Sequence, residues 1–88
     1  MYFVYILECA DNTLYVGSTP DLIKRLHQHN NLKNGAHYTK IRRPVVLRYS
    51  EAQNSVSEAR KREAELKRLT RKKKLELINA STAQEDSL

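Results

Sequence analysis

The N-terminal segment holds the pattern that most constrains the fold, two strand-like runs separated by a turn-like sequence. The runs cover residues 2–9 and 13–17, and the turn-like residues are 10–12. Valine, isoleucine and tyrosine favour extended strands, whereas aspartate and asparagine favour turns. The sequence therefore predicts an N-terminal β-hairpin that carries one tyrosine on each strand, Tyr5 and Tyr15.

The length of the turn decides whether the two tyrosines share a face of the hairpin. A two-residue turn would place Tyr5 and Tyr15 on opposite faces, because side chains alternate along a strand. A three-residue turn pairs Tyr5 with Gly17 and Leu7 with Tyr15, which puts both tyrosines on one face. The longer turn needs a left-handed residue at its end, and Asn12 tolerates that conformation. We predict the three-residue turn.

The remaining sequence predicts three helices and one further strand. Thr19 is expected to cap the first helix, and Ser55 with Glu58 matches a capping box for the second. The predicted elements are a helix at 19–30, a polar loop at 31–43, a strand at 45–49, a helix at 55–69 and a short helix ending near 79. The order ββαβαα predicts an α+β fold, a three-stranded antiparallel sheet flanked by helices. We expect one domain over 1–79 and a disordered tail at 80–88.

Positive charge is concentrated in one half of the chain. The net charge is +6, and of the 16 lysines and arginines all but three lie between Lys40 and Lys74. Such an asymmetric basic surface attracts a polyanion such as nucleic acid. The alternative is an ordinary solvated helix face. A membrane surface is a poorer match, because the basic helices lack a large aromatic or leucine face.

Several classes of protein do not match the composition. No apolar run approaches the roughly 20 residues that span a bilayer, and residues 2–7 lack the basic leader of a signal peptide. Cys9 is the only cysteine, so the chain has no internal disulfide and a reducing compartment is expected. We therefore expect a cytoplasmic protein.

Glu63 occupies an unusual position on its predicted helix. Helical periodicity places it on the same side as Ala59 and Leu66, whereas Glu65 falls on the opposite side. A carboxylate that faces a core is costly unless it is paired, hydrogen-bonded or bound to a metal. Two structural explanations remain open, a salt bridge to Arg25 or a position at the edge of the apolar stripe.

Arg25 and His29 lie four residues apart and share one face of the first predicted helix. Leu22, Ile23 and Leu26 define the expected buried side, and Arg25 and His29 flank it. A guanidinium can hold a phosphate with two hydrogen bonds, and an imidazole can transfer a proton near neutral pH. The structural alternative is that Arg25 pairs with Glu63 while His29 only packs.

The two tyrosine motifs resemble those of the GIY-YIG nuclease superfamily, and more closely its small single-domain members of the UPF0213 type. Phe3-Val4-Tyr5 stands in the place of GIY, and Tyr15-Val16-Gly17 stands in the place of YIG. Phe3 departs from the glycine of the superfamily name. The resemblance covers residues 2–78. Ala59, Glu63 and Lys67 also reproduce the spacing around the superfamily's metal-binding glutamate.

The resemblance implies a metal-dependent endonuclease that hydrolyses phosphodiester bonds in nucleic acid. DNA is the expected substrate, and the sequence leaves RNA open. The resemblance also implies a base role for Tyr15, which Tyr5 could share, without a firm choice between the two, and one Mg²⁺ or Mn²⁺ ion on Glu63. The implied catalytic residues are Tyr5, Tyr15, Arg25, His29 and Glu63. The expected nucleic-acid contacts are Lys24, His37, Lys40, Arg42, Arg43 and Lys67, and Asn79 is a weaker candidate that a helix C-cap would equally explain.

Two other functions remain open on the sequence. The first is a nucleic-acid-binding module of the same fold with little cleavage activity, dependent on a protein partner for any cutting. The second is a purely structural basic protein, for which only composition argues. We expect a monomer with no membrane association.

Overall fold

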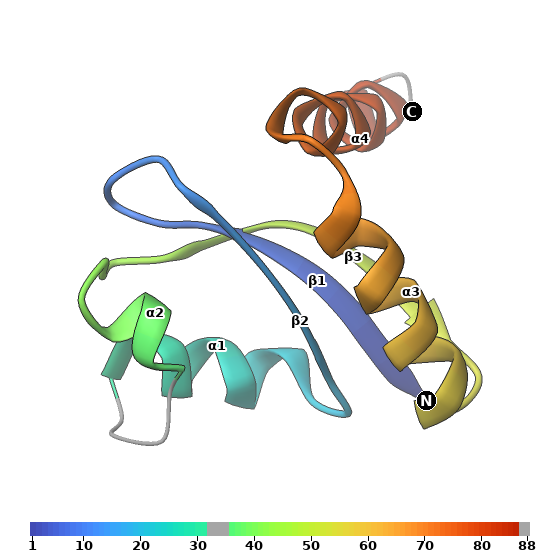
Figure 1. Ribbon diagram of the computed structural model, residues 1–88, viewed down its shortest axis with the longest axis horizontal. Helices are drawn as coiled ribbons and strands as arrows, with labels where there is room; N and C mark the ends of the chain where they lie inside the picture. Colours follow the sequence, from blue (N-terminus) through green and yellow to red (C-terminus); the bar gives the residue numbers. More distant parts are fainter. Residues whose placement is uncertain (32–35, 87–88) are drawn as a thin grey trace.

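The computed structural model describes residues 1–31 and 36–86 and confirms the predicted α+β class. The strands are β1 (Tyr2–Glu8), β2 (Leu14–Thr19) and β3 (Val46–Gln53), and the helices are α1 (Leu22–Asn31), α2 (His37–Lys40), α3 (Val56–Arg68) and α4 (Arg71–Asp86). The strands form one antiparallel sheet in the order β2-β1-β3 (Figure 1). The single-turn helix α2 lies within the segment that was predicted to be a loop.

The hairpin has the predicted three-residue turn. Tyr5 pairs with Gly17 and Leu7 pairs with Tyr15, so both tyrosines lie on one face of the sheet. Asn12 has a φ of 67°, which is the left-handed conformation that this turn requires. The residue type at the end of the turn thus sets the register, and the register places the tyrosines.

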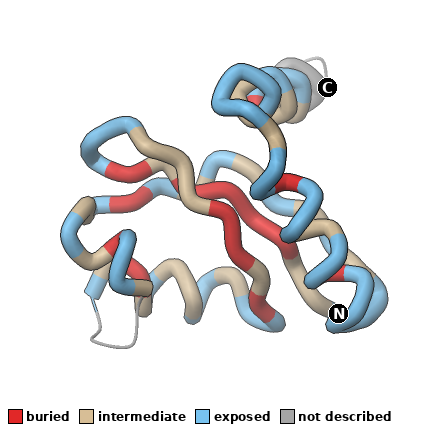
Figure 2. Tube along the Cα trace, viewed as in Figure 1, coloured by how far each residue is buried: buried red, intermediate tan, exposed pale blue. Residues whose placement is uncertain are grey.

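The sheet forms the middle layer of the molecule, because side chains of the central strand β1 enter two different cores. Val4 and Ile6 pack with residues of α3 and α4, whereas Tyr5 and Leu7 pack with residues of α1. The buried residues follow the strands, while the outer faces of the helices are exposed (Figure 2). Among the described helices, none is long and apolar enough to cross a membrane.

The start of α1 differs from the prediction. Asp21 caps the helix, because its Oδ1 accepts a hydrogen bond of 3.0 Å from the backbone N–H of Lys24. Thr19 is the last residue of β2, and its hydroxyl accepts a bond of 3.1 Å from the backbone N–H of Asp21. The prediction that Thr19 caps the helix is therefore wrong. Asp21 is equally suitable as a cap and lies at the point where the chain has already left the sheet.

The buried face of α1 is also shifted from the predicted one. Ile23 was expected on the buried side, but it is 85% exposed. Leu22 and Leu26 pack against the core, and His29 is completely buried. The face that meets the sheet therefore runs through Leu22, Leu26 and His29. Periodicity alone could not show this, because it does not fix where the sheet lies.

The other helices follow their predicted starts more closely. Ser55 caps α3, and its hydroxyl accepts a bond of 3.1 Å from the backbone N–H of Glu58. Helix α4 was predicted to end near Asn79, but it continues to Asp86, since no glycine or proline interrupts it. The described part of the predicted tail, 80–86, is thus helical, and residues 87–88 lie outside the described residues. The domain boundary at residue 79 stays a prediction.

The corrected face of α1 can be tested by truncating Ile23, with Leu66 of α3 as a buried reference. Ile23→Ala should change the free energy of unfolding by less than about 0.5 kcal/mol, because the side chain is exposed. Leu66→Ala, at a fully buried position of α3, should lower it by about 2–5 kcal/mol. Urea unfolding followed by circular dichroism measures both. A large loss for Ile23→Ala would contradict the placement of α1.

Candidate active site

His29 lies at the centre of a buried chain of hydrogen bonds. Its Nε2 is 2.8 Å from the hydroxyl of Tyr5, and its Nδ1 is 2.8 Å from the hydroxyl of Thr39. His29 and Thr39 have no exposed surface, and Tyr5 is almost completely buried. The chain joins three elements, because Tyr5 lies on β1, His29 on α1 and Thr39 on α2.

The surroundings keep both titratable groups of this chain neutral near pH 7. Burial lowers the pKa of His29 to about 4, and the nearby positive charges of Arg25 and Arg43 act in the same direction. Burial raises the pKa of Tyr5 to about 12, although a hydrogen bond from Arg25 opposes that rise. A neutral imidazole thus faces a protonated phenol, so the bond between the Tyr5 hydroxyl and Nε2 of His29 contains one hydrogen.

Arg25 occupies the open side of this buried pair. Its guanidinium donates a hydrogen bond of 2.8 Å to Oε1 of Gln28, and it also interacts with the Tyr5 hydroxyl. Arg25, Lys24 and Gln28 line a cleft of about 290 Å³ that also borders Thr19. A guanidinium at the wall of a cleft can hold a phosphate oxygen with charge-assisted hydrogen bonds.

Tyr15 covers His29 from the β2 side. The two rings meet edge to face, with centroids 5.2 Å apart, and the Tyr38 ring stacks on Tyr15 at 5.9 Å. The guanidinium of Arg42 lies 3.9 Å from the centre of the Tyr38 ring. This stack holds α2 against the hairpin, and it leaves Tyr15 half-buried beside the imidazole.

Gly17 makes the packing of both tyrosines possible. A Cβ atom at this position would lie 2.5 Å from the Tyr5 hydroxyl and 3.2 Å from a ring carbon of Tyr15. The first separation is too short for any side chain to be accommodated without movement. The glycine of the second tyrosine motif therefore serves the internal placement of Tyr5.

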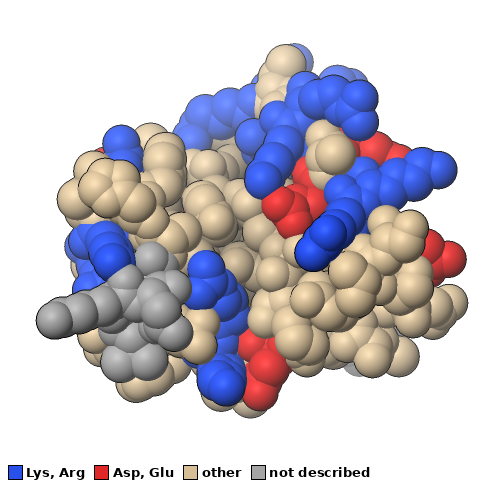
Figure 3. Space-filling view, turned by 60° about the horizontal axis from the view of Figure 1, so that its bottom comes forward, with Lys and Arg blue, Asp and Glu red and all other residues tan. Residues whose placement is uncertain are grey.

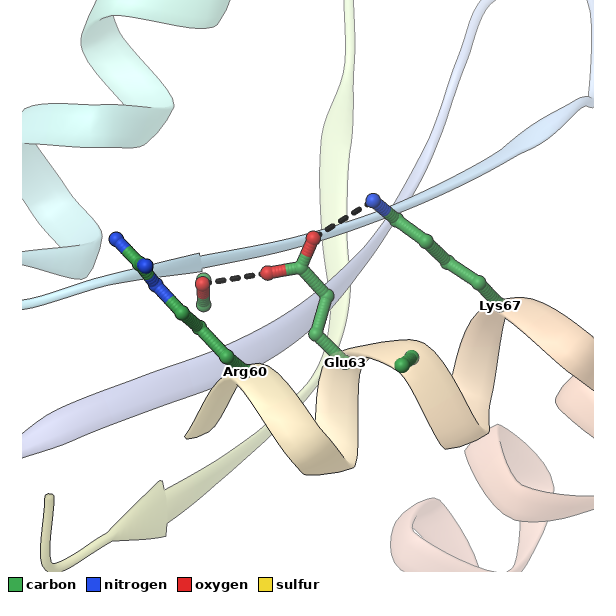
Figure 4. Close-up of a pocket in the computed structure, with 5 residues that line it drawn as sticks. Arg60, Glu63 and Lys67 are labelled. Atoms are coloured by element: carbon green, nitrogen blue, oxygen red, sulfur yellow. Dashed lines mark hydrogen bonds and ion pairs between the residues drawn. The ribbon is translucent and has the colours of Figure 1, made fainter. Parts of the chain in front are cut away.

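Glu63 lies on α3, where two partners fix its carboxylate. The Ser18 hydroxyl donates a bond of 2.5 Å to Oε1, and the Lys67 ammonium lies 2.7 Å from Oε2 (Figure 4). Burial alone would raise the pKa of Glu63, but the bonds from Lys67 and Ser18 outweigh it and hold the pKa below its ordinary value. The carboxylate is therefore ionised, and it lines a cleft of about 400 Å³ with Ser18, Arg60, Ala64 and Lys67.

Helix α3 is itself held firmly on the sheet. Ala59 and Leu66 are fully buried in the core, and the Arg62 guanidinium donates a bond of 2.6 Å to Glu51 of β3. These contacts fix the helix on both sides of Glu63. The carboxylate therefore faces the sheet although its side chain remains 20% exposed.

The predicted residues meet as two groups around the edge strand β2. Tyr5, Tyr15, Arg25 and His29 lie together on the face covered by α1, whereas Glu63 approaches from the face covered by α3. Ser18 and Thr19, neighbours at the end of β2, line the Glu63 cleft and the Arg25 cleft respectively. The two clefts are thus adjacent around the sheet edge, and the Glu63 charge also raises the pKa of Tyr5.

The groups around Glu63 suit a magnesium-type ion, which keeps water ligands, better than a metal whose ligands all come from the protein. Within residues 1–31 and 36–86, no group of three or more histidines, cysteines, aspartates or glutamates lies close enough to hold a metal. Mg²⁺ is commonly held by one or two carboxylates with water and substrate phosphate as the other ligands. Glu63, beside the Ser18 hydroxyl, provides one such carboxylate. An ion there would have to displace or share space with the Lys67 ammonium.

Some predicted nucleic-acid contacts are open to a ligand. Lys24 and His37 are exposed, Lys67 is 55% exposed, and Lys40 is half-buried. Figure 3 shows lysine and arginine side chains gathered on one part of this face with acidic side chains among them, further ones at the lower edge, and mostly uncharged residues between. Asn79 is exposed within α4, so it is not a C-cap and its predicted role stays a prediction.

The other two predicted contacts take part in internal bonds. Arg42 donates a bond of 3.0 Å to the Asp11 carboxylate and one of 2.9 Å to the backbone oxygen of Tyr38. Arg43 donates a bond of 2.6 Å to the backbone oxygen of His29. Their side chains therefore help to hold α2 and the end of α1, and their contact with nucleic acid stays a prediction.

Sequence reasoning missed three residues of the site, Ser18, Tyr38 and Thr39. Ser18 had an available signal, because it follows the second tyrosine motif by one position and side chains alternate along the strand. Thr39 and Tyr38 lie in a segment that looks like a polar loop, and no periodicity marks a single-turn helix there.

Comparison with known proteins agrees with this fold and site. The sequence pattern of the GIY-YIG catalytic domain matches residues 1–76. A UPF0213 protein of Syntrophus aciditrophicus is 54% identical over 76 residues, which are 86% of this chain and 87% of that protein. A UPF0213 protein of Staphylococcus saprophyticus is 51% identical over 78 residues, 89% of this chain and 94% of that protein.

A solved structure extends the likeness to three dimensions. The solution NMR structure of a UPF0213 protein from Bacillus halodurans is 41% identical, with a TM-score of 0.58. The match covers 91% of this chain and 85% of that one. The fold and the site define a small nuclease-type domain, and the chain belongs to the GIY-YIG family.

The neutral state of buried His29 predicts a specific dependence of stability on pH. The pKa of His29 falls from 6.5 to about 4 on folding, so the unfolded chain binds more protons between these values. The contribution of His29 to stability should be complete above about pH 6.5 and should be lost as the pH falls towards 4. Unfolding of His29→Gln, measured across this range, should show a flatter pH dependence than the wild type.

The exposed His27 offers a matched control on the same helix. His27→Gln should keep the pH dependence of the wild type. If His29→Gln also keeps it, the imidazole is not buried in its neutral form.

Proposed function

We propose that this protein is a metal-dependent endonuclease that hydrolyses phosphodiester bonds in nucleic acid, with DNA as its substrate. The observation that carries the proposal is the meeting of two groups at the end of β2. A buried phenol–imidazole pair with a guanidinium lies on one side, and an ionised carboxylate lies on the other. Membership of a nuclease-type family supports the same function.

The chain's own residues provide the elements of proton transfer and phosphate binding. Arg25 binds the phosphoryl oxygens in its cleft and stabilises the charge that develops on them. Tyr5 takes a proton from the attacking water as it gives its own proton to Nε2 of His29. His29 ends the step as an imidazolium, and the phosphate charge beside Arg25 favours that form. A divalent ion held by Glu63 would neutralise the leaving oxygen.

This mechanism gives the two tyrosines different roles. The hydroxyl of Tyr5 is bonded to His29, so Tyr5 is the phenol placed to relay a proton. Tyr15 contacts the imidazole with its ring and is half-buried. We expect Tyr15 to shape the space in which the water is held. Tyr5→Phe should therefore reduce cleavage more than Tyr15→Phe.

A substrate panel tests the proposed activity. The purified chain is incubated with single-stranded, duplex, flapped and branched DNA and RNA, in the presence of Mg²⁺, Mn²⁺ or EDTA. We expect cleavage of at least one DNA substrate with either metal and none with EDTA. Absence of cleavage on every substrate would contradict the proposed endonuclease activity.

Substitutions test the assigned residues once a substrate is found. Glu63→Gln should abolish metal-dependent cleavage and leave binding nearly unchanged, because it removes a charge but little volume. Arg25→Ala should lower kcat by about 10²–10³ and also weaken binding, because a phosphate clamp acts before and during the reaction. Glu65→Gln provides the control, an exposed glutamate of the same helix. If Glu63→Gln and Arg25→Ala cleave as fast as the wild type and the control, the assignment of Glu63 and Arg25 to the active site is wrong.

One observation favours the second candidate, a binding module with little cleavage. The ammonium of Lys67 already neutralises Glu63, which lessens the attraction of the carboxylate for a metal. In that case the affinity for DNA should fall linearly with salt on a logarithmic plot, while no substrate is cut. A salt-independent affinity, or no binding at about 50 mM salt, would exclude both candidates.

A further inference from the structure

The hydrogen bonds on both sides of His29 determine which ring nitrogen carries its hydrogen. Thr39 donates its hydroxyl hydrogen to the backbone oxygen of Ala36 at 2.9 Å. A hydroxyl has one hydrogen, so the same oxygen must act as an acceptor toward Nδ1 of His29 at 2.8 Å. Nδ1 is therefore the protonated nitrogen, and Nε2 carries the free lone pair.

The Tyr5 side leads independently to the same tautomer. The phenol oxygen already interacts with Arg25, which can only donate. If Nε2 of His29 also donated to that oxygen, the phenol hydrogen would lose the Nε2 acceptor in a site that is almost completely buried. The phenol therefore donates to Nε2 over 2.8 Å. The whole chain runs in one direction, from Tyr5 through His29 and Thr39 to Ala36.

We propose that Thr39 is a positioning residue, which holds His29 in the Nδ1-protonated tautomer so that Nε2 accepts the proton of Tyr5. This role rests on the proposed function. Thr39 does not touch the substrate or the water, since it is fully buried behind the imidazole. It acts only through the orientation and the tautomer of His29, as second partners of functional histidines do.

The fold keeps Thr39 in place by contacts outside the site. The backbone oxygen of Ala36 also accepts bonds from the N–H groups of Thr39 and Lys40, which form the single turn of α2. The stack of Tyr38 on Tyr15 and the bonds of Arg42 to Asp11 hold that turn against the hairpin. Helix α2 thus provides a fixed acceptor for the imidazole.

Two substitutions at one position separate the hydroxyl from the shape of the side chain. Thr39→Val keeps the branched shape and removes the acceptor of Nδ1, whereas Thr39→Ser keeps the hydroxyl and removes a methyl group. NMR correlation of the ring nitrogens with the ring hydrogens reports the tautomer of His29 in the ¹⁵N-labelled full chain at pH 7. The spectrum of His29→Gln identifies the signals of His29.

The expected results follow from the direction of the hydrogen bonds. The wild type and Thr39→Ser should show the Nδ1-protonated form, and Thr39→Val should shift the population toward the Nε2-protonated form. Thr39→Val should also lower kcat by about 10–100-fold with little change in KM, because substrate binding does not use this residue. Thr39→Ser should restore most of the rate. The amide spectra check that each variant is folded.

Two outcomes would overturn the proposal. The first is a wild type in which His29 is protonated at Nε2. The second is a folded Thr39→Val that keeps both the tautomer and the kcat of the wild type. The tautomer is measured without substrate, so the test is separate from that of the endonuclease. A wild type that cuts nothing but shows the Nδ1-protonated form would contradict the proposed function and support the assigned tautomer.

Discussion

The arrangement of this site depends on one buried imidazole. His29 has no exposed surface, and each of its ring nitrogens is bonded to a hydroxyl from a different element, Tyr5 of β1 and Thr39 of α2. A buried imidazole nitrogen without a hydrogen bond would lower the stability of the fold. Helix α1 therefore packs where both hydroxyls lie within hydrogen-bond distance of His29. The same contacts that set the position of the helix therefore also set the position of the phenol beside Arg25.

The edge strand β2 connects the two sides of the molecule. Side chains alternate along it, so Gly17 and Thr19 face α1 while Val16 and Ser18 face α3. A central strand would be covered on both edges, and residues from its two faces would stay separated by the sheet. At the end of an edge strand the two faces come together around the backbone. This explains how residues from two different cores form neighbouring clefts.

The sequence predicted the hairpin well and the helices less well. Asn12 limits the turn to one register, and that register alone places Tyr5 opposite Gly17. The stripe of Ala59 and Leu66 also indicated correctly that Glu63 faces the sheet. The error at Ile23 has a physical cause, because the helix meets the sheet through His29, a polar residue that hydropathy assigns to the surface. Thr39 could not be found for a similar reason, since its role exists only in three dimensions.

The two parts of the site rest on different hydrophobic cores, on opposite faces of the sheet. Glu63 depends on the packing of α3 and α4 around Ile6 and Leu66, whereas His29 depends on the packing of α1 against Leu7 and on its bond to Thr39 of α2. Local opening free energies differ between parts of a fold, so the layer of α3 and the layer of α1 can be loosened to different extents. Substitutions in the layer of α3 that keep the charge of Glu63 can therefore accumulate during evolution with little effect on the Tyr5–His29 pair, whereas loss of that charge would remove one of the influences that raise the pKa of Tyr5.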